Sequence, residues 1–309
     1  MAASLVGMVI FLTVMDWWRF ATHGRLGPWN LPRPTRWTFL SGIGTGLIVI
    51  TTTMAYTIEG VSIVFAMLLM RGGLLILAPL VDFLSRRRVR WFSWAGLVLS
   101  LVALLVAFSE PPRPGSSRFT LNLFLLADVA VYLASYFLRL RFMSRLAKCD
   151  DPDVTKRYFV EEQMVATPVI LLVLALLAAS GGVPDAVPGA WGHFTDSLRQ
   201  GFTTFWLRDP VIVGTAILIG VCSQFTGIFG GLILLDKSEN AFAVPVNRCS
   251  SVLAGVLASL LLWLVWRQAD PPQPPPDPYE MAGAAVVILA IVFLTVPPQW
   301  ERRRALGAR

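Results

Sequence analysis

The sequence is poor in charged residues and in the residue types that most often carry enzyme chemistry. Only 15% of its 309 residues are charged, and it has two histidines and three cysteines, whereas 55% of the residues are hydrophobic. A soluble domain carries about a quarter charged residues. The low charge and a mean hydropathy of +0.65 therefore indicate an integral membrane protein.

The scarce reactive residues are also badly spaced for catalysis. His23 and His193 fall in separate predicted loops, and no G-x-S-x-G or H-E-x-x-H motif is present. The cysteines (Cys149, Cys222 and Cys249) have neither disulfide-framework nor metal-site spacing. We therefore expect no enzyme activity, no metal and no cofactor.

Long apolar stretches recur along the whole chain. A helix needs about 20 apolar residues to cross the hydrocarbon core, and by that rule the sequence predicts nine spans. They cover roughly residues 1–18, 38–57, 62–84, 91–108, 120–138, 161–181, 210–234, 241–265 and 281–297. Residues 188–207 are amphipathic and are expected to form a helix that lies in the membrane interface. The predicted fold class is an all-α polytopic membrane protein.

Alternate loops differ sharply in positive charge. Most of the 26 Lys and Arg residues lie in one set of loops, which holds Arg19–Arg36, "RRRVR" at 86–90, Arg139–Arg157, Lys237 and the C-terminal "ERRR". The positive-inside rule places that set in the cytoplasm. We therefore expect an inner-membrane protein with its C-terminus inside and its N-terminus outside. Because the positive charge is explained in this way, no nucleic-acid partner is expected.

The sequence contains a weak internal repeat. Residues 65–84 align with residues 242–261, so that Phe65 meets Phe242 and Arg71 meets Arg248. The acidic turn at Glu59 then falls outside the membrane, while its counterpart at Asp236 falls inside. The sequence thus predicts two inverted copies, residues 1–118 with four spans and residues 119–309 with five, the first lacking one leading helix.

Two stretches resemble a known transporter family. Residues 62–108 are an apolar helix, a short basic turn and a next helix that starts with Trp and Gly, and Leu123–Phe142 is similar to the helix that opens a second repeat. Together they resemble the drug/metabolite transporter superfamily, particularly its EamA-like members and nucleotide-sugar transporter relatives. The resemblance implies a five-plus-five inverted repeat of helices that transports a small molecule.

Polar residues inside predicted spans are the candidates for function, because they are costly in lipid. Arg71 and Arg248 occupy equivalent places in the two copies, and an arginine fork suits phosphate or carboxylate. They either bind an anion or are neutralised internally to hold the helices together. Asp128 is their fixed counter-charge or a proton-coupling carboxylate. Asp82 is expected to neutralise positive charge in the basic turn at 86–90.

Further polar residues at membrane depth complete the predicted site. Asn247, Gln224 and Tyr132 are expected to line a substrate cavity, and Glu162 is expected to be an ion-pair or coupling acid. The G-x-x-x-G patterns at Gly42–Gly46 and Gly227–Gly231 predict close helix packing.

These features predict a secondary transporter that moves a small polar metabolite, most simply an anion, by alternating access. Its partners would be the substrate and the lipid bilayer, with proton coupling and a homodimer as open alternatives. Two other functions remain compatible with the sequence. The same arginines would serve a flippase for lipid-linked phosphates, and the repeat would also suit a non-transporting membrane scaffold subunit.

Overall fold

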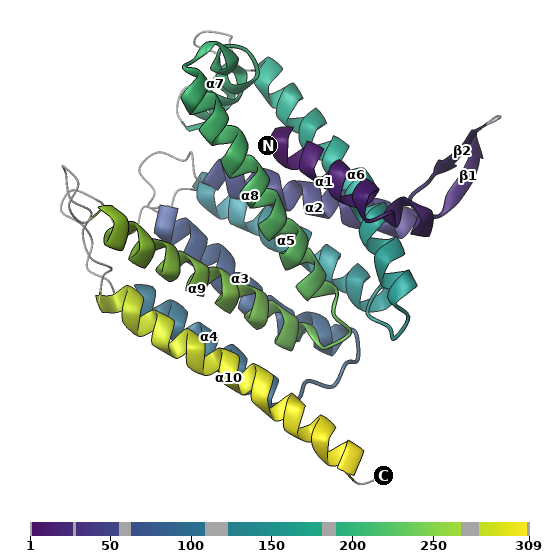
Figure 1. Ribbon diagram of the computed structural model, residues 1–309, viewed down its shortest axis with the longest axis vertical. Helices are drawn as coiled ribbons and strands as arrows, with labels where there is room; N and C mark the ends of the chain where they lie inside the picture. The colour runs from purple at the N-terminus through teal and green to yellow at the C-terminus, as the bar shows by residue number, and fades with distance from the viewer. Residues whose placement is uncertain are drawn as a thin grey trace. The chain divides into compact units, whose positions relative to one another are not determined.

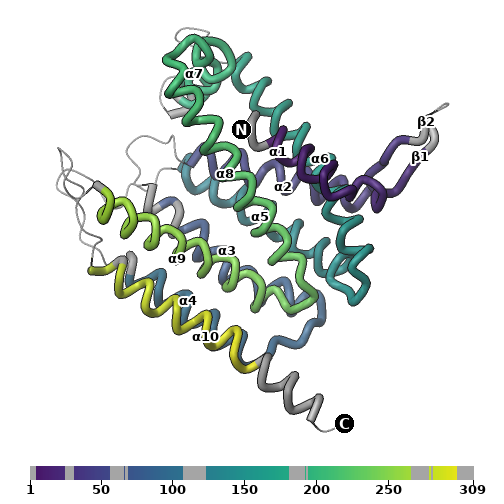
Figure 2. The backbone as a smooth tube through the Cα atoms, viewed as in Figure 1, coloured from purple at the N-terminus to yellow at the C-terminus, as the bar shows by residue number. Residues whose placement is uncertain are grey.

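The computed structural model describes residues 2–26, 29–55, 63–108, 123–180, 190–266 and 278–307 (Figure 2). In these ranges the chain forms ten α-helices, two short 3₁₀ helices and one antiparallel hairpin. The elements are α1 (Ala2–Val14), η1 (Trp17–Phe20), β1 (His23–Leu26), β2 (Trp29–Pro32), α2 (Arg36–Ala55), α3 (Ile63–Leu84), α4 (Trp91–Phe108), α5 (Leu123–Leu146), α6 (Pro152–Ser180), α7 (Ala190–Phe202), η2 (Phe205–Leu207), α8 (Pro210–Leu235), α9 (Asn240–Trp266) and α10 (Pro278–Gly307).

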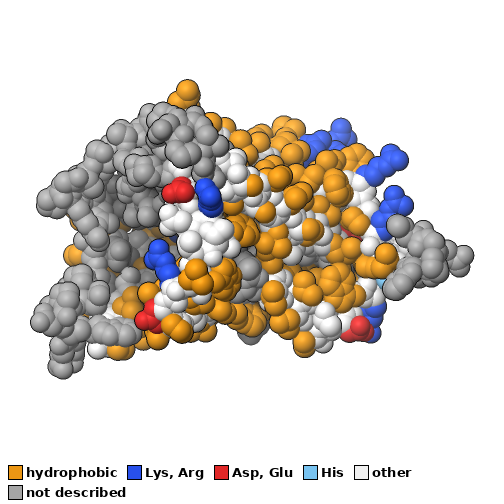
Figure 3. Space-filling model, turned by 90° about the horizontal axis from the view of Figure 1, so that it is seen from above, with side chains coloured by type: hydrophobic (Ala, Val, Ile, Leu, Met, Phe, Trp, Pro, Cys, Tyr) orange, Lys and Arg blue, Asp and Glu red, His pale blue; other side chains and the backbone are white. Residues whose placement is uncertain are grey.

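The helices have the length and composition of membrane-embedded segments. Among the described residues, α2, α5, α6, α8 and α9 are long and apolar enough to cross a bilayer, and α1, α4 and α10 contain shorter apolar segments. The face drawn in Figure 3 is mostly hydrophobic. The predicted all-α, membrane-embedded class is therefore confirmed in this coarse form.

Several predicted boundaries are wrong, and charge explains the largest errors. Helix α5 continues to Leu146 instead of ending near residue 138, and α6 begins at Pro152 instead of residue 161. The predicted limits fall at Arg139 and Glu161 because hydropathy drops there, but both side chains are buried inside the fold. The β1–β2 hairpin was not predicted. The amphipathic segment expected at residues 188–207 contains helix α7.

The chain divides into two compact units. The first unit comprises Met1–Ala66 and Phe119–Lys237, and the second comprises Met67–Arg118 and Ser238–Arg309. Each unit thus combines segments from both predicted copies. The acidic turn at Glu59, the copy boundary at 118/119 and most of the proline-rich connection before α10 lie outside the described residues.

Within each unit the helices pack in a simple order (Figure 1). In the first unit α2 packs against both α5 and α6, α1 packs against α8, and α7 packs on α6. In the second unit α4 lies along α10, and α9 contacts both. This order places α2, α5 and α6 around one shared interior.

Glycines let α2 approach its neighbours closely. A Cβ on Gly42 would lie 2.5 Å from the Cβ of Val165 and 2.8 Å from the carbonyl oxygen of Glu162, both on α6. A Cβ on Gly46 would lie 3.0 Å from Cγ1 of Val169 on the same helix, while Gly44 faces the carbonyl of Ser135 on α5. The predicted packing role of Gly42–Gly46 is therefore confirmed.

The second G-x-x-x-G pattern does not act as a pair. A Cβ on Gly231 would meet the ring of Phe159 at 3.3 Å and Nη2 of Arg139 at 3.8 Å. A Cβ on Gly227 would meet no atom within 4 Å among the described residues. Only Gly231 makes room for a neighbour in this structure.

Gly42→Ala is expected to destabilise the protein by about 1–3 kcal/mol, because the added methyl group overlaps a backbone carbonyl that cannot move alone. Thermal unfolding in detergent measures the effect. Gly214→Ala on α8 is the matched control, since no described atom lies within 4 Å of its Cβ position. Equal melting temperatures for the two variants would contradict the close approach of α2 to α6.

Candidate functional site

A buried ion pair joins α5 to α6 in the first unit. Nε of Arg139 donates to Oε1 of Glu162 at 3.0 Å, and Nη2 donates to Oε2 at 3.1 Å. The Arg139 and Glu162 side chains are 8% and 0% exposed. Two parallel bonds in a fork are the strongest form of this contact. Glu162 is therefore an ion-paired acid, as one of its two predicted roles required, and its partner was not predicted.

Helix α2 completes the bonds to the Glu162 carboxylate. The hydroxyls of Ser41 and Thr45 donate to Oε1 at 2.8 and 2.9 Å. Four residues apart, they lie on the same helix face, beside Gly42, which allows the close approach. The hydroxyls of Ser41 and Tyr158 also share a 2.6 Å hydrogen bond. The carboxylate thus receives four hydrogen bonds, which offset the cost of burying its charge.

The neighbouring acid, Glu161 of α6, accepts hydrogen bonds from the connection between α1 and α2 and from the start of α2. Its Oε1 accepts from the amide and hydroxyl of Thr22, and its Oε2 accepts from the amide of Thr35 and the hydroxyl of Thr38. The α1–α2 connection is thereby fixed to α6. Lys237, after α8, pairs with Asp150 between α5 and α6 at 2.6 Å. Three loops that were predicted to share one side of the membrane thus meet at one end of this unit.

Asp128 differs from both glutamates. It lies on α5, its side chain is buried, and none of the described residues donates a hydrogen bond to either carboxylate oxygen. Within the described ranges, therefore, no residue acts as a hydrogen-bonded counter-charge for Asp128. An ionised carboxylate in such surroundings is costly, so the neutral acid is the form that this conformation accommodates.

The other two candidates of the first unit lie on different helices. Tyr132 is buried one turn after Asp128, and its ring meets that of Tyr136 edge to face at 4.9 Å. Gln224 is half-buried on α8, where its Cγ would lie 3.3 Å from a Cβ on Gly7 of α1. Gln224 thus packs in the α1–α8 contact, apart from the buried face of α5.

The remaining candidates belong to the second unit. Arg71 is half-buried on α3, and Asn247 and Arg248 are half-buried on α9. Both arginines, which were predicted from opposite sequence copies, therefore belong to the same compact unit. Asp128 belongs to the other unit.

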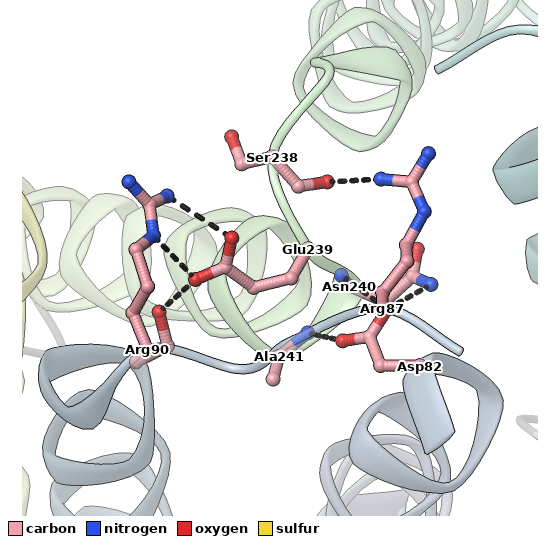
Figure 4. Close-up of polar contacts among 8 residues, drawn as sticks. Asp82, Arg87, Arg90, Ser238, Glu239, Asn240 and Ala241 are labelled. Carbon is pink, nitrogen blue, oxygen red and sulfur yellow. Dashed lines mark hydrogen bonds and ion pairs between the residues drawn. The ribbon is translucent and has the colours of Figure 1, made fainter. Parts of the chain in front are cut away.

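A carboxylate joins the end of α3 to the start of α9 (Figure 4). Oδ1 of Asp82 accepts from the amide and side-chain nitrogens of Asn240 at 2.9 and 2.7 Å, and Oδ2 accepts from the amide of Ala241 at 2.7 Å. The first amides of a helix have no partner within the helix and favour a negative charge. We call Asp82, Asn240 and Ala241 the Asp82 clamp. The sequence predicted a partner in the basic turn at 86–90, and did not foresee the bonds to α9.

A second carboxylate lies beside the clamp. Glu239 receives Nε and Nη2 of Arg90 at 2.9 and 3.0 Å and the hydroxyl of Ser93 at 2.6 Å, while Nη1 of Arg87 donates to the carbonyl of Ser238 (Figure 4). Burial raises the pKa of Glu239, but hydrogen bonds from Arg90 and Ser93 outweigh it and leave the pKa below its usual value. The α3–α4 connection is therefore held to the start of α9.

Arg71 and Arg248 lie at similar distances from the Asp82 clamp, measured along their own helices. Arg71 lies eleven residues before Asp82, or about 16 Å along α3, and Arg248 lies eight residues after Asn240, or about 12 Å along α9. Helix α3 ends two residues after Asp82, and α9 begins at Asn240. The two distances along the helices thus differ by about 4 Å, less than one helical turn. Each helix also has a proline between clamp and arginine, at Pro79 and Pro245.

A scan against models of known protein families finds no match to this chain. A search of curated proteins finds no significant match either. The arguments on function therefore rest on the residues and their geometry.

The sequence contained a signal for the missed ion pair. Arg139 continues the series Asp128, Tyr132 and Tyr136 at intervals of three or four residues, the period of one helix face. A charged residue on the buried face of an apolar helix calls for a partner, and Glu162 is the acid that begins the next apolar run.

Glu162→Gln is expected to destabilise the protein by about 3–5 kcal/mol, because it leaves the guanidinium of Arg139 buried without a counter-charge. Replacing both residues by glutamine should cost less than the sum of the two single replacements. Denaturant unfolding in detergent micelles measures all three variants. Asp150→Asn, which breaks the exposed pair with Lys237, is the control and should have little effect. A Glu162→Gln variant as stable as that control would contradict a structural role for the pair.

Proposed function

We propose that this protein is a secondary transporter of a small polar anion and that Arg71 and Arg248, with Asn247 beside them, bind the substrate. The observation that carries the proposal is the register set by the Asp82 clamp. It places two half-buried arginines of one compact unit at distances from the clamp that differ by less than a helical turn, on helices whose one other charged residue is Asp82 itself. Two arginine forks suit a phosphate or carboxylate group.

Two further features support a transporter. The compact units each combine helices from both predicted sequence copies, as expected if an inverted repeat forms two bundles that rearrange during alternating access. The residues 62–108 that resemble the drug/metabolite transporters include α3, its basic turn and α4. The proposal therefore agrees with the architecture that this resemblance implies.

Asp128 is the proposed coupling residue. A buried acid without a hydrogen bond can hold a proton in this conformation and release it when its surroundings change. The fully bonded Glu161 and Glu162 lack that freedom. Proton movement through Asp128 would then drive the anion.

A non-transporting scaffold is the second candidate, and the hydrogen bonds of Glu161 and Glu162 favour it. Glu161 and Glu162 each accept four hydrogen bonds, so the α2, α5 and α6 interior of the first unit is locked by polar contacts. A scaffold needs such rigidity and no exchangeable acid. Reconstitution separates the two functions, because a scaffold would leave every solute outside the vesicle.

Arg71→Ala and Arg248→Ala are each expected to reduce anion uptake by roughly 10–100-fold, since each removes a hydrogen bond to a charged group, worth about 1.5–3 kcal/mol. Proteoliposomes offered phosphorylated and carboxylated solutes give the measurement. Arg71→Lys and Arg248→Lys keep the charge without the fork and should retain intermediate uptake. Arg88→Ala, which removes an exposed arginine of the 86–90 turn, is the control. Normal uptake by both alanine variants would defeat the arginine assignment.

The proposed orientation places the α5–α6 connection on the cytoplasmic side of an inner membrane. Cys149 is exposed in that connection, whereas Cys222 lies within the apolar helix α8 and Cys249 is buried. A membrane-impermeant maleimide should therefore label the protein only after intact cells are opened. The label should disappear in Cys149→Ser. Labelling of Cys149 in intact cells would contradict the proposed orientation and place the α5–α6 connection outside.

A further inference from the structure

Helix α2 carries four buried hydroxyl groups, on Thr38, Ser41, Thr45 and Thr51. Three of them donate to acids of α6: Thr38 donates to Glu161, and the two that follow it donate to Glu162. The hydroxyl of Thr51 instead donates to the carbonyls of residues 47 and 48 of its own helix, at 2.8 and 3.1 Å. Among the described residues, Thr51 is thus the buried hydroxyl of α2 that serves no acid in this conformation.

The directions of the three helices of this interior follow from their contacts. Gly42 and Gly46 of α2 meet Val165 and Val169 of α6 in the same order, so α2 and α6 run in the same direction. Helix α5 contacts α6 and is joined to it by the short connection 147–151, so these two run in opposite directions. Helices α2 and α5 are therefore antiparallel.

The register of this antiparallel pair brings Thr51 opposite Asp128. A Cβ on Gly44 of α2 would lie 3.2 Å from the carbonyl oxygen of Ser135 on α5, which fixes one level. Thr51 lies seven residues after Gly44, and Asp128 lies seven residues before Ser135. Seven residues are about two helical turns, so both side chains stay on the sides that face each other. Their exposures of 3% and 2% agree with that placement.

The helices packed against α5 bring no charge to this level. Apart from Arg36 at its first residue, α2 has no charged or titratable side chain, and α6 has none after Glu162. The titratable groups on the same face of α5 are Tyr132, Tyr136 and Arg139. The arginine is eleven residues from Asp128, about 16 Å along the helix, and is paired with Glu162. The hydroxyl of Thr51 is therefore the donor that α2 offers at the level of the unbonded acid.

We propose that Thr51 is the hydrogen-bond donor for Asp128 when that acid is ionised. The inference rests on the coupling role that the proposed function gives to Asp128. The carbonyls that Thr51 now contacts also accept the amide bonds of the helix, and a threonine in a helix has two accessible rotamers. Rotation about its Cα–Cβ bond therefore frees the hydroxyl without breaking α2. The freed hydroxyl stabilises the carboxylate, as Ser41 and Thr45 stabilise Glu162.

The test measures the ionisation of Asp128 against pH in the full-length chain reconstituted in lipid. Infrared difference spectroscopy records the carbonyl band of the protonated acid, and Asp128→Asn identifies the band by removing it. Thr51→Val keeps the shape of the side chain but removes a donor to the ionised acid. The pH at which half of the band has disappeared should therefore rise by roughly 1–2 pH units, as for one hydrogen bond to a charged group.

Three variants control for other effects of the substitution. Thr51→Ala also removes the hydroxyl and should give the same shift, whereas Thr51→Ser keeps the hydroxyl and should keep the wild-type midpoint. Thr53→Val is the matched control, because Thr53 makes the same kind of bond, to the carbonyl of Val49 at 2.8 Å, on another side of α2. It should also keep the wild-type midpoint.

The outcomes separate this role of Thr51 from the proposed function. Wild-type midpoints in Thr51→Val and Thr51→Ala, with the Asp128 band titrating, would overturn the role of Thr51 and leave the coupling role intact. Equal shifts in Thr51→Val and Thr53→Val would also overturn it, because the effect would then come from the backbone of α2. If no band depends on Asp128 at any pH, the coupling role fails, and the role of Thr51 fails with it.

Discussion

The hydrogen-bonded ion pair of Arg139 and Glu162 is the interaction on which the first unit depends. A charge inside an apolar bundle costs several kcal/mol unless it is paired and its remaining lone pairs are satisfied. That requirement explains the local sequence. Ser41 and Thr45 must reach the carboxylate from α2, so α2 must touch α6, and Gly42 is the residue that permits this contact. The glycine pattern and the hydroxyls thus form one solution to one buried charge.

The same physical rule identifies the exceptional acid. Glu161 and Glu162 lie in the third turn of α6, and Asp82 and Glu239 lie near the ends of α3 and α9. Each of the four accepts three or four hydrogen bonds. Asp128 is buried to a similar degree and accepts none from the described residues. Hydrogen-bond donors thus stabilise four of these five carboxylates in their ionised form, and Asp128 is the exception. The proposed coupling role would account for this difference, because fixed donors would hold Asp128 in the ionised form.

The sequence predicted the helices well and their ends poorly, for one physical cause. Apolar runs locate a helix, but Arg139 and Glu161 look like loop residues when their hydropathy is considered without partners. Only the fold shows that they are paired, and that α5 and α6 therefore continue past them. The clamp of Asp82 on α9 joins residues 158 positions apart, and no local pattern encodes that separation. The repeat did align Arg71 with Arg248, but it could not show that both belong to one unit.

In the transporter that we propose, coupling would act between the two units, because Asp128 belongs to the first and both arginines belong to the second. An anion and a proton influence each other only if each one prefers a different state of the whole protein. The clamp and the ion pair are unsuited to report such a change, since each is held by several short hydrogen bonds. Asp128 is suited to it, because one or two donors brought within reach would favour its ionised form by several kcal/mol. In the proposed mechanism, the arginines stay fixed as binding groups, while the protonation of a single acid distinguishes the states.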